Sequence, residues 1–459
     1  MGFSGVVFLY TFLPGALLLY FLTPKSWRRA VLLGESLVFY AWAGPKYLPL
    51  LLGMTVLGWG FGLLMDKLTA PKSRRLALTG FILLSLCPLL LCKYGDFLLS
   101  GIGALTGTSI PLLRLGLPLG ISFYTFSVLS YGVDVYRGKK GEKNLLSFAL
   151  YMTMFPKLTS GPIARYEGMA ESLACPRVSL QRAGHGVTRF LLGLGKKILL
   201  ADQLALLVSA CKTSGEQTVL LTWLYALGYT LQLYFDFSGY SDMAIGLGEL
   251  LGFTLPENFS YPYMAKSLTD FWRRWHMTLG SWFRDYLYIP LGGNRKGKLR
   301  WMLNLLIVWA ATGLWHGAGW NFILWGLFFG ILLMAEKLLL LPYLTKSRLL
   351  GRVYVWLCLL ISFILFDNTS LSAAFGYIGG LFGGLPLVSA ESLYLLRSYG
   401  ILLLLGVLGA TPLPKKLWEK GEKLPVMQVL APVLLGLLLL LCTAFMVDGS
   451  FVSFMYFRF

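Results

Sequence analysis

The chain has 459 residues, of which 56% are hydrophobic and only 13% are charged, and its mean hydropathy is +0.68. A soluble domain is about a quarter charged, so this composition cannot cover a surface that faces water. The aromatic content of 15% excludes a disordered protein, and six cysteines without a Cys-x-x-Cys pair exclude a disulfide scaffold. The three histidines lie far from one another and from the cysteines, so no zinc site is expected. These features predict an all-α integral membrane protein.

The net charge is +19, from 40 Lys and Arg against 21 Asp and Glu. In a soluble protein this balance would indicate nucleic acid, but here the basic residues concentrate in short segments between apolar runs. That distribution follows the positive-inside rule and predicts cytoplasmic loops. The same loops are compatible with docking of an anionic donor, such as a phosphate-bearing coenzyme or an acidic carrier protein.

The first apolar segment, Gly2–Thr23, carries no charge and is followed by basic residues, the reverse of a signal peptide. We interpret it as a retained span whose N-terminus lies outside. Later crossings are expected at Ala30–Gly44, Tyr47–Met65, Leu76–Cys92 and Leu115–Val133. With these crossings, and a C-terminus outside, the basic clusters all face the cytoplasm; they include Arg28, Arg74, Lys139 and Lys416.

Asn144–Pro156 is apolar but shorter than the roughly 20 residues that a span requires, and we interpret it as a re-entrant or partly buried helix. Arg177–Lys197 is basic and amphipathic, which is typical of a helix at the membrane surface. Further spans are expected at Gln217–Phe235, Val353–Phe366, Tyr399–Leu413 and Leu424–Val447. Together these segments predict about ten or eleven membrane-embedded helices in a single domain over 1–459, made of N-terminal spans (1–143), a core (144–335), and C-terminal spans with an aromatic tail (336–459).

Two regions place polar chemistry within this apolar chain. The first is a helix that Ser267 and Asp270 would open with capping-box spacing, and that would continue to Pro290. In it, His276 would share a face with Trp272, Leu279 and Phe283. Its charges, Arg273 among them, indicate an interfacial or cavity-lining position because charges facing lipid are costly.

The second region is Trp301–Ala335, which contains no Asp, Glu, Lys or Arg. A straight helix of this length would measure roughly 50 Å against a hydrocarbon core of about 30 Å. The chain must therefore tilt, break or turn back, and the glycines over 313–319 predict a break with His316 among them. Broken backbone at membrane depth is tolerated only where it faces protein or a watery cavity, so His316 is a functional candidate. The alternative is a packing histidine that bonds a neighbouring helix.

These two regions carry a resemblance to a known family. The stretches Phe271-Trp-Arg-Arg-Trp-His276-Met-Thr-Leu, Trp282 to Arg295 with Leu-Gly-Gly-Asn-Arg, and Leu314-Trp-His316-Gly-Ala-Gly-Trp-Asn-Phe resemble the membrane-bound O-acyltransferase (MBOAT) family. Phe155–Pro162 and Leu233–Asp242 are also similar to it. The resemblance covers nearly the whole chain and is closest to the alginate O-acetyltransferase branch.

The resemblance implies a multi-helix bundle with re-entrant or interfacial helices around a central tunnel. An acyl group would pass from a cytoplasmic thioester donor, acetyl-CoA or an acyl carrier protein, to an extracytoplasmic acceptor. It also implies that His316 is catalytic and that His276 supports it in the same cavity. An exported esterase-like (SGNH) partner is expected to complete transfer to the glycan.

The chemistry also fits the residues themselves. Acyl transfer from a thioester to a hydroxyl needs no metal or redox cofactor, only a base and a dry, oriented site, and a neutral imidazole is a suitable base. Asn321 or a backbone amide at the glycine break is a candidate to stabilise the oxyanion. No Gly-x-Ser-x-Gly elbow is present, which favours a nucleophilic serine on a partner. The remaining candidate substrate contacts are Arg273, Trp275, Trp315 and Asp236.

Two features admit a second interpretation. Asp236 and Asp242 either hold positive charge in the cavity or, as is more common, cap a helix or pair with Arg. The aromatic tail with Tyr456, Phe457 and Phe459 is either an interfacial belt or a docking strand for a partner.

We interpret the protein as an O-acyltransferase of the bacterial cell membrane that acetylates a surface polysaccharide. The alternatives are D-alanine or lipid acylation by the same fold, and a multi-pass transporter or channel.

Overall fold

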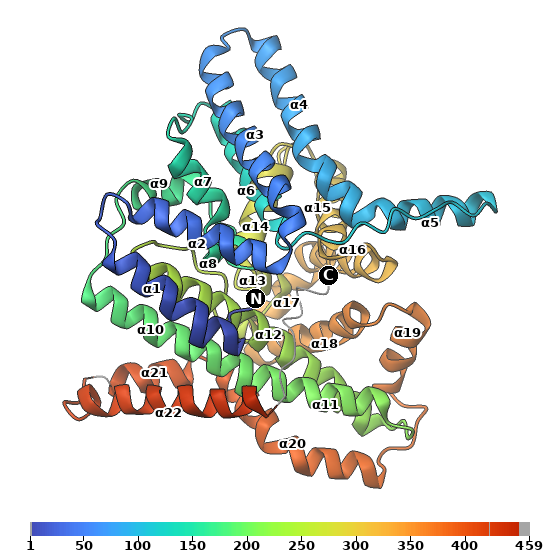
Figure 1. Cartoon of the computed structure of the whole chain (residues 1–459). Coiled ribbons are helices and arrows are strands. Elements are labelled where there is room, and N and C mark those ends of the chain that lie inside the picture. The colour runs from blue at the N-terminus through green and yellow to red at the C-terminus, as the bar shows by residue number, and fades with distance from the viewer. Residues whose placement is uncertain (1, 422, 449–459) are drawn as a thin grey trace. The chain divides into compact units, whose positions relative to one another are not determined.

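The computed structural model describes residues 2–421 and 423–448, apart from the side chain of Thr345, and this part of the chain is helical without strands (Figure 1). The predicted all-α class is confirmed. The chain divides into two compact units, Met1–Phe190 with Met243–Pro256, and Leu191–Asp242 with Glu257–Phe459. Each unit is described by itself.

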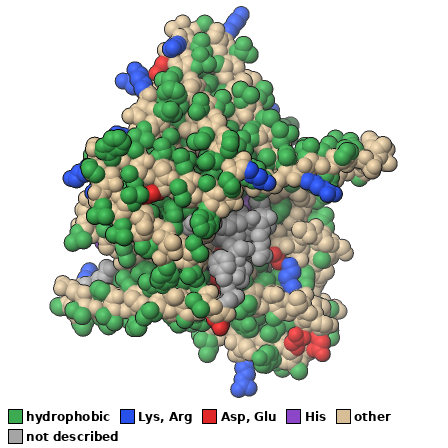
Figure 2. Space-filling model, viewed as in Figure 1, with side chains coloured by type: hydrophobic (Ala, Val, Ile, Leu, Met, Phe, Trp, Pro, Cys, Tyr) green, Lys and Arg blue, Asp and Glu red, His purple; other side chains and the backbone are tan. Residues whose placement is uncertain are grey.

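Six helical stretches among the described residues are long and apolar enough to cross a membrane. Hydrophobic side chains are spread across the face seen in Figure 2, with only scattered Lys and Arg among them, which suits contact with lipid. The protein is therefore a multi-pass membrane protein. The six stretches are Pro45–Lys67, Pro71–Thr106, Trp320–Leu344, Arg348–Asp367, Ala390–Gly409 and Met427–Val447.

The first unit is built around a pair of long neighbouring helices, α3 and α4, which pack against α6 (Figure 1). Its helices, with short π-helical or 3-10 turns labelled η, are η1 (Phe8–Phe12), α1 (Leu13–Leu22), α2 (Arg28–Ala43), η2 (Pro45–Tyr47), α3 (Leu48–Lys67), α4 (Pro71–Leu89), η3 (Leu90–Tyr94), α5 (Gly95–Thr106), α6 (Ile121–Tyr136), α7 (Leu145–Thr153), α8 (Phe155–Leu158) and α9 (Tyr166–Ala174). Helices α10 (Leu180–Gly195) and α12 (Val219–Leu250) run through both units.

Three predicted spans of this unit, Gly2–Thr23, Ala30–Gly44 and Leu115–Val133, are not among the six stretches. The first helix covers only Phe8–Leu22, which is shorter than a span. Before it, the ring of Phe3 lies 4.9 Å from that of Phe8. The span expected to start at Leu115 begins only at Ile121. Before it, the Asp96 carboxylate accepts hydrogen bonds from the backbone of Leu113 and Arg114, which holds this segment outside the helix.

The short segment over 144–158 agrees with the prediction of a buried helix. The Asn144 side chain accepts a hydrogen bond from the Ser147 amide at the start of α7, which is buried from Ser147 to Thr153. Helix α8 is buried throughout, and the ammonium of Lys157 lies 4.3 Å from the centre of the Tyr151 ring. A substituted Gly161 would clash with the backbone at Lys157, so only glycine fits there.

The second unit holds both histidines of interest. Its elements are η4 (Lys196–Ala201), α11 (Asp202–Thr213), η5 (Pro262–Met264), α13 (Leu268–Trp272), α14 (Met277–Phe283), η6 (Arg284–Tyr288), α15 (Lys298–His316), α16 (Trp320–Ala335), η7 (Glu336–Leu340), α17 (Leu341–Lys346), α18 (Arg348–Asp367), α19 (Leu371–Gly380), α20 (Ala390–Gly409), α21 (Leu413–Gly421) and α22 (Met427–Val447). Helix α20 starts nine residues before the predicted Tyr399, because Ser389 and Ser392 cap it reciprocally.

Candidate functional site

The apolar region predicted to break does so. Helix α15 ends at His316, three residues in extended or bent conformation follow, and α16 starts at Trp320. The two helices then pack along each other through Gly313 and Gly326. A methyl group on either glycine would lie under 3.0 Å from a backbone oxygen of the other helix, so the close approach requires glycine at both positions.

The ring of His316 is buried in aromatic surroundings at the end of α15. Its residue is 4% exposed, and ring centroids lie 4.9 Å away for Trp315, 5.0 Å for Trp325 and 5.3 Å for Phe366. All three contacts are edge-on. Such surroundings exclude water, and an imidazole held in a dry site is a group that can take up a proton in its neutral form.

The region around His276 is not the continuous helix that the sequence predicts. Ser267 does cap α13 by accepting a hydrogen bond from the Asp270 amide at 3.0 Å, but this helix ends at Trp272. The Asp270 carboxylate does not return to Ser267; it pairs with Arg274 at 2.8 Å. His276 has left-handed backbone angles (φ 43°, ψ 53°) at the start of α14, so it lies at a break and not on a helix face. For a non-glycine residue this conformation costs about 1–3 kcal/mol and must be held by its surroundings.

Asn258 is the residue that holds this break. Its backbone oxygen accepts a hydrogen bond from the Met277 amide at 3.0 Å, and its side-chain oxygen accepts one from the Thr278 hydroxyl at 2.9 Å. The same oxygen lies 3.0 Å from Nδ1 of His276. His276 is 2% exposed, and its Nε2 has no hydrogen-bond partner among the described residues. His276 lies outside the six apolar stretches. Burial lowers the pKa of its imidazole to about 3, so the ring is neutral.

His276 and His316 both contact the side chain of Trp315. The Trp315 ring lies 5.7 Å from the ring of His276 and 4.9 Å from that of His316. The ring of His276 also contacts Phe237 on α12, edge-on at 4.7 Å. Two buried imidazoles around one tryptophan form an apolar site with nitrogen atoms as its polar groups. Such a site suits proton transfer to or from a substrate, and we call it the histidine site (His276, Trp315, His316).

The other predicted substrate contacts lie in different settings. Trp275 is packed between aromatic rings, with Phe259 at 5.1 Å and Phe271 at 5.5 Å, whereas Arg273 is exposed. Asn321 is buried, and its amide donates a hydrogen bond to the Phe366 carbonyl at 3.1 Å. Their roles toward substrate stay predictions.

Asp236 belongs to a buried ion cluster. Its carboxylate lies 2.7 Å from the ammonium of Lys197, which also contacts Asp202 at 2.5 Å, and all three side chains are 2% exposed. Asp242 pairs with Lys196 at 2.6 Å. Helix capping or pairing with arginine was the commoner expectation for both aspartates, whereas each of them forms an ion pair with a lysine.

Sequence reasoning did not single out Asn258 or Glu336. Both oxygens of the buried Glu336 accept hydrogen bonds from the first amides of α13, at 2.6 Å from Leu268 and 2.9 Å from Thr269. Glu336 is the first acidic residue after the charge-free run, which is the signal that could have drawn attention to it. No comparable signal marks Asn258.

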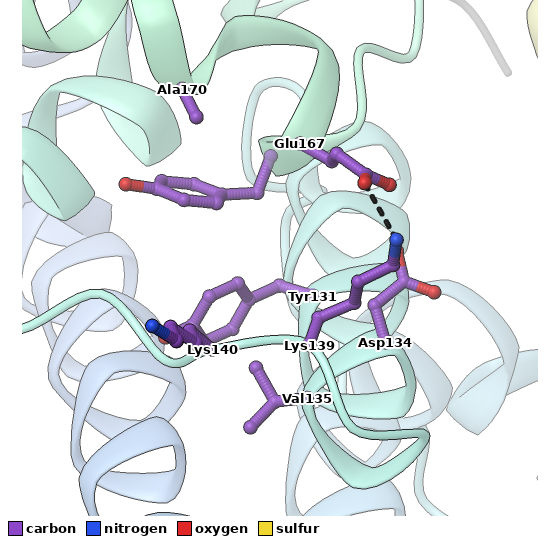
Figure 3. A pocket seen from close by; sticks show the side chains of 8 residues that line it. Tyr131, Asp134, Val135, Lys139, Lys140, Glu167 and Ala170 are labelled. Carbon is purple, nitrogen blue, oxygen red and sulfur yellow. Dashed lines mark hydrogen bonds and ion pairs between the residues drawn. The ribbon is translucent and has the colours of Figure 1, made fainter.

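The first unit contains a second candidate, a cavity of about 180 Å³ next to the predicted cytoplasmic charges (Figure 3). Tyr131, Asp134 and Lys140 contribute to its lining, and Lys139 forms an ion pair with Glu167 at 2.6 Å. The cavity offers hydroxyl and charged groups without an imidazole. It is therefore a weaker candidate for acyl transfer than the histidine site.

Among the residues that the structure describes, no group of three or more His, Cys, Asp or Glu side chains is placed so that it could hold a metal ion. The predicted docking residues Tyr456, Phe457 and Phe459 lie outside the described residues.

Comparison with known proteins decides the family. The model of the membrane-bound O-acyltransferase family matches residues 128–366, a range that contains both histidines. The chain belongs to the membrane-bound O-acyltransferase family. It is 41% identical over 393 residues to the probable alginate O-acetylase AlgI of Pseudomonas syringae pv. tomato (83% of this chain, 75% of the relative). It is 40% identical over 389 residues to that of Azotobacter vinelandii (83% and 78%) and 35% identical over 373 residues to the peptidoglycan O-acetyltransferase of Helicobacter pylori (73% and 70%). The resemblance to the alginate branch of the MBOAT family is confirmed, and the protein is an O-acyltransferase.

Proposed function

We propose that this MBOAT protein transfers an acetyl group from a cytoplasmic thioester, acetyl-CoA or an acetylated carrier protein, to an acceptor hydroxyl, and that this transfer serves the O-acetylation of a cell-surface polysaccharide. The observation that carries the proposal is the histidine site, in which two buried imidazoles contact one tryptophan. The names of the relatives support a polymer outside the cytoplasm as the final acceptor.

In the proposed reaction the acceptor hydroxyl oxygen attacks the carbonyl carbon of the thioester. A C–O bond forms, and the C–S bond breaks when the tetrahedral intermediate collapses. The proton of the hydroxyl passes to the imidazole of His316 and from there to the departing thiolate. The aromatic surroundings of His316 exclude water, which would otherwise hydrolyse the thioester.

The proposal includes an exported esterase-like partner that passes the acetyl group to the glycan. In its support, the sequence contains no Gly-x-Ser-x-Gly elbow, and acetylation of a polymer needs access on the outer side. The aromatic tail around Tyr456 is the proposed docking segment for this partner.

The test is the acetyl ester content of surface polysaccharide in cells that contain equal membrane amounts of each variant. His316→Ala should lower ester content by at least about a hundredfold, the usual contribution of a general base. The matched control is His185→Ala, because His185 is exposed on α10 and has no assigned role. Near-normal ester content with His316→Ala would favour the transporter interpretation, and esters of D-alanine or of lipid in place of acetyl glycan would identify the other acyl reactions.

A further inference from the structure

The hydrogen bonds of Asn258 define which of its side-chain atoms faces His276. Asn258 is 0% exposed, and its Nδ2 donates a hydrogen bond to the Ser241 hydroxyl at 3.1 Å. Its other side-chain atom receives the backbone N–H of Thr278 at 3.4 Å. A backbone N–H can only donate, so the atom that it meets must be the carbonyl oxygen Oδ1.

The identity of that oxygen determines the tautomer of His276. Oδ1 of Asn258 lies 3.0 Å from Nδ1 of the ring, and a carbonyl oxygen only accepts hydrogen bonds. Nδ1 must therefore carry a hydrogen and donate it. In a neutral imidazole the second nitrogen is then unprotonated, so Nε2 presents a lone pair.

On α12 and the 267–283 segment around His276, the charged side chains are either paired with an opposite charge or exposed. On α12, Asp236 pairs with Lys197 and Asp242 pairs with Lys196. On the 267–283 segment, Asp270 pairs with Arg274 and Arg273 is exposed. On α15 the facing titratable group is His316, across Trp315. None of these groups competes with Asn258 for Nδ1 in the part of the chain that the structure describes.

The lone pair of Nε2 is buried, and no described residue donates to it. The left-handed backbone of His276 shows that the fold accepts strain to hold the ring in this place. An orphaned acceptor on a strained, anchored ring is suited to a hydrogen-bond donor that arrives from outside the chain.

We propose that Asn258 is a positioning residue that fixes the Nδ1–H form of His276, so that Nε2 accepts a hydrogen bond from the bound substrate. The inference rests on the proposed acyl transfer. Two substrate groups have the required chemistry: a hydroxyl of the acceptor next to the one that reacts, and an amide N–H in the arm of the thioester donor. In both cases Asn258 never touches the substrate and acts through the ring.

The direct test is ¹⁵N solid-state NMR of the full-length protein in lipid bilayers, with labelled histidine. The chain has only three histidines, so the His276 signals are assigned by their loss in His276→Gln. We expect the neutral Nδ1–H tautomer for His276 at neutral pH. The Nε2–H tautomer or an imidazolium at this position would overturn the inference, and this readout does not depend on enzymatic activity.

Two variants of Asn258 sharpen the test. Asn258→Asp places a carboxylate against Nδ1, which raises the pKa of His276 and turns Nε2 into a donor. Its transfer activity should therefore be low at acid pH and recover as pH rises, with the acid limb displaced by about one pH unit or more. The matched control is Asn304→Asp, an equally buried amide that bonds the Leu291 and Gly293 carbonyls, and it should leave the His276 tautomer unchanged.

Asn258→Leu removes the acceptor and frees the ring to turn. In membrane vesicles supplied with labelled acetyl-CoA, we expect transfer to fall by at least about tenfold, since the other tautomer offers an N–H where an acceptor is needed. A raised KM for acetyl-CoA would identify the donor arm as the bound group, whereas a lower rate at an unchanged KM would identify the acceptor hydroxyl. Wild-type kinetics in Asn258→Leu and an unshifted profile in Asn258→Asp would overturn the inference. If His276→Gln and His316→Ala also kept full activity, the proposed function itself would fail.

Discussion

The two histidine regions reach the same tryptophan by different physical routes. In the 298–335 region, glycines interrupt an apolar run, and His316 lies at the end of a regular helix. In the 257–283 region, the sequence has the pattern of one helix, yet the chain breaks at His276 in a left-handed conformation. The first break is local, because the glycines themselves permit it. The second is imposed from elsewhere in the chain.

The imposed break depends on long-range partners. Asn258 binds the ring and the start of α14, and Glu336 binds the start of α13 from 67 and 68 positions away in sequence. A residue with strained backbone angles can therefore interrupt a sequence that has a helical pattern. Hydrogen bonds from distant side chains then replace the backbone bonds that the helix has lost. Substitutions that act on one region and not on the other test whether the two breaks have different causes.

The largest effect on stability is expected at the glycine contact of the His316 region. Gly326→Ala would place a methyl group against the backbone oxygen of Trp309 and force α15 and α16 apart. We expect a loss of about 2 kcal/mol or more in the free energy of unfolding, as for overpacked cores. Thermal unfolding in detergent measures it, with Gly400→Ala on α20, where a methyl group meets open space, as the control. Equal unfolding temperatures for the two variants would contradict the tight helix contact.

A smaller effect is expected from the long-range partner of the His276 region. Glu336→Ala would leave the buried amide of Leu268 and the partly buried amide of Thr269 without their acceptor. The expected loss is about 1–3 kcal/mol, and Glu336→Gln should lose less because one oxygen remains. Limited proteolysis of the 257–283 segment, compared with the 298–335 segment of the same sample, would detect selective loosening. Uniform loosening of both would contradict a local role for Glu336.

The smallest effect is expected at Asn321. Since its amide donates to the Phe366 carbonyl, Asn321→Ala should lower the free energy of unfolding by about 1 kcal/mol and reduce acyl transfer less than tenfold. An oxyanion donor would instead cost about a hundredfold or more in rate. Transfer assays at equal protein amounts distinguish the two, and a hundredfold loss would assign Asn321 to the oxyanion.

Much of the fold was predictable because membrane helices depend on local properties. Apolar length predicts the spans near Val353–Phe366 and Leu424–Val447, and glycine predicts the break before α16. The course of the chain before Ile121 was not predictable, since the Asp96 carboxylate holds the backbone of Leu113 and Arg114 over 17 and 18 positions.

The sequence predicted the two histidines of the candidate site, but it did not predict the residues that hold them in place. Both histidines stand out in the sequence because His is rare in this chain and lies in tryptophan-rich stretches. Asn258 does not stand out, because its role depends on a backbone oxygen and a side-chain oxygen that meet His276 and its neighbours only after folding. The lysine partners of Asp236 and Asp242 were missed for the same reason.

The most direct test of acyl transfer at the histidine site follows labelled acetyl from acetyl-CoA into alkali-labile esters in membrane vesicles with equal amounts of each variant. We expect His316→Ala to lower the initial rate at saturating acetyl-CoA by at least about a hundredfold, and His276→Ala to lower it less. A rate for His316→Ala within a few-fold of the wild-type rate would contradict a catalytic role for this histidine.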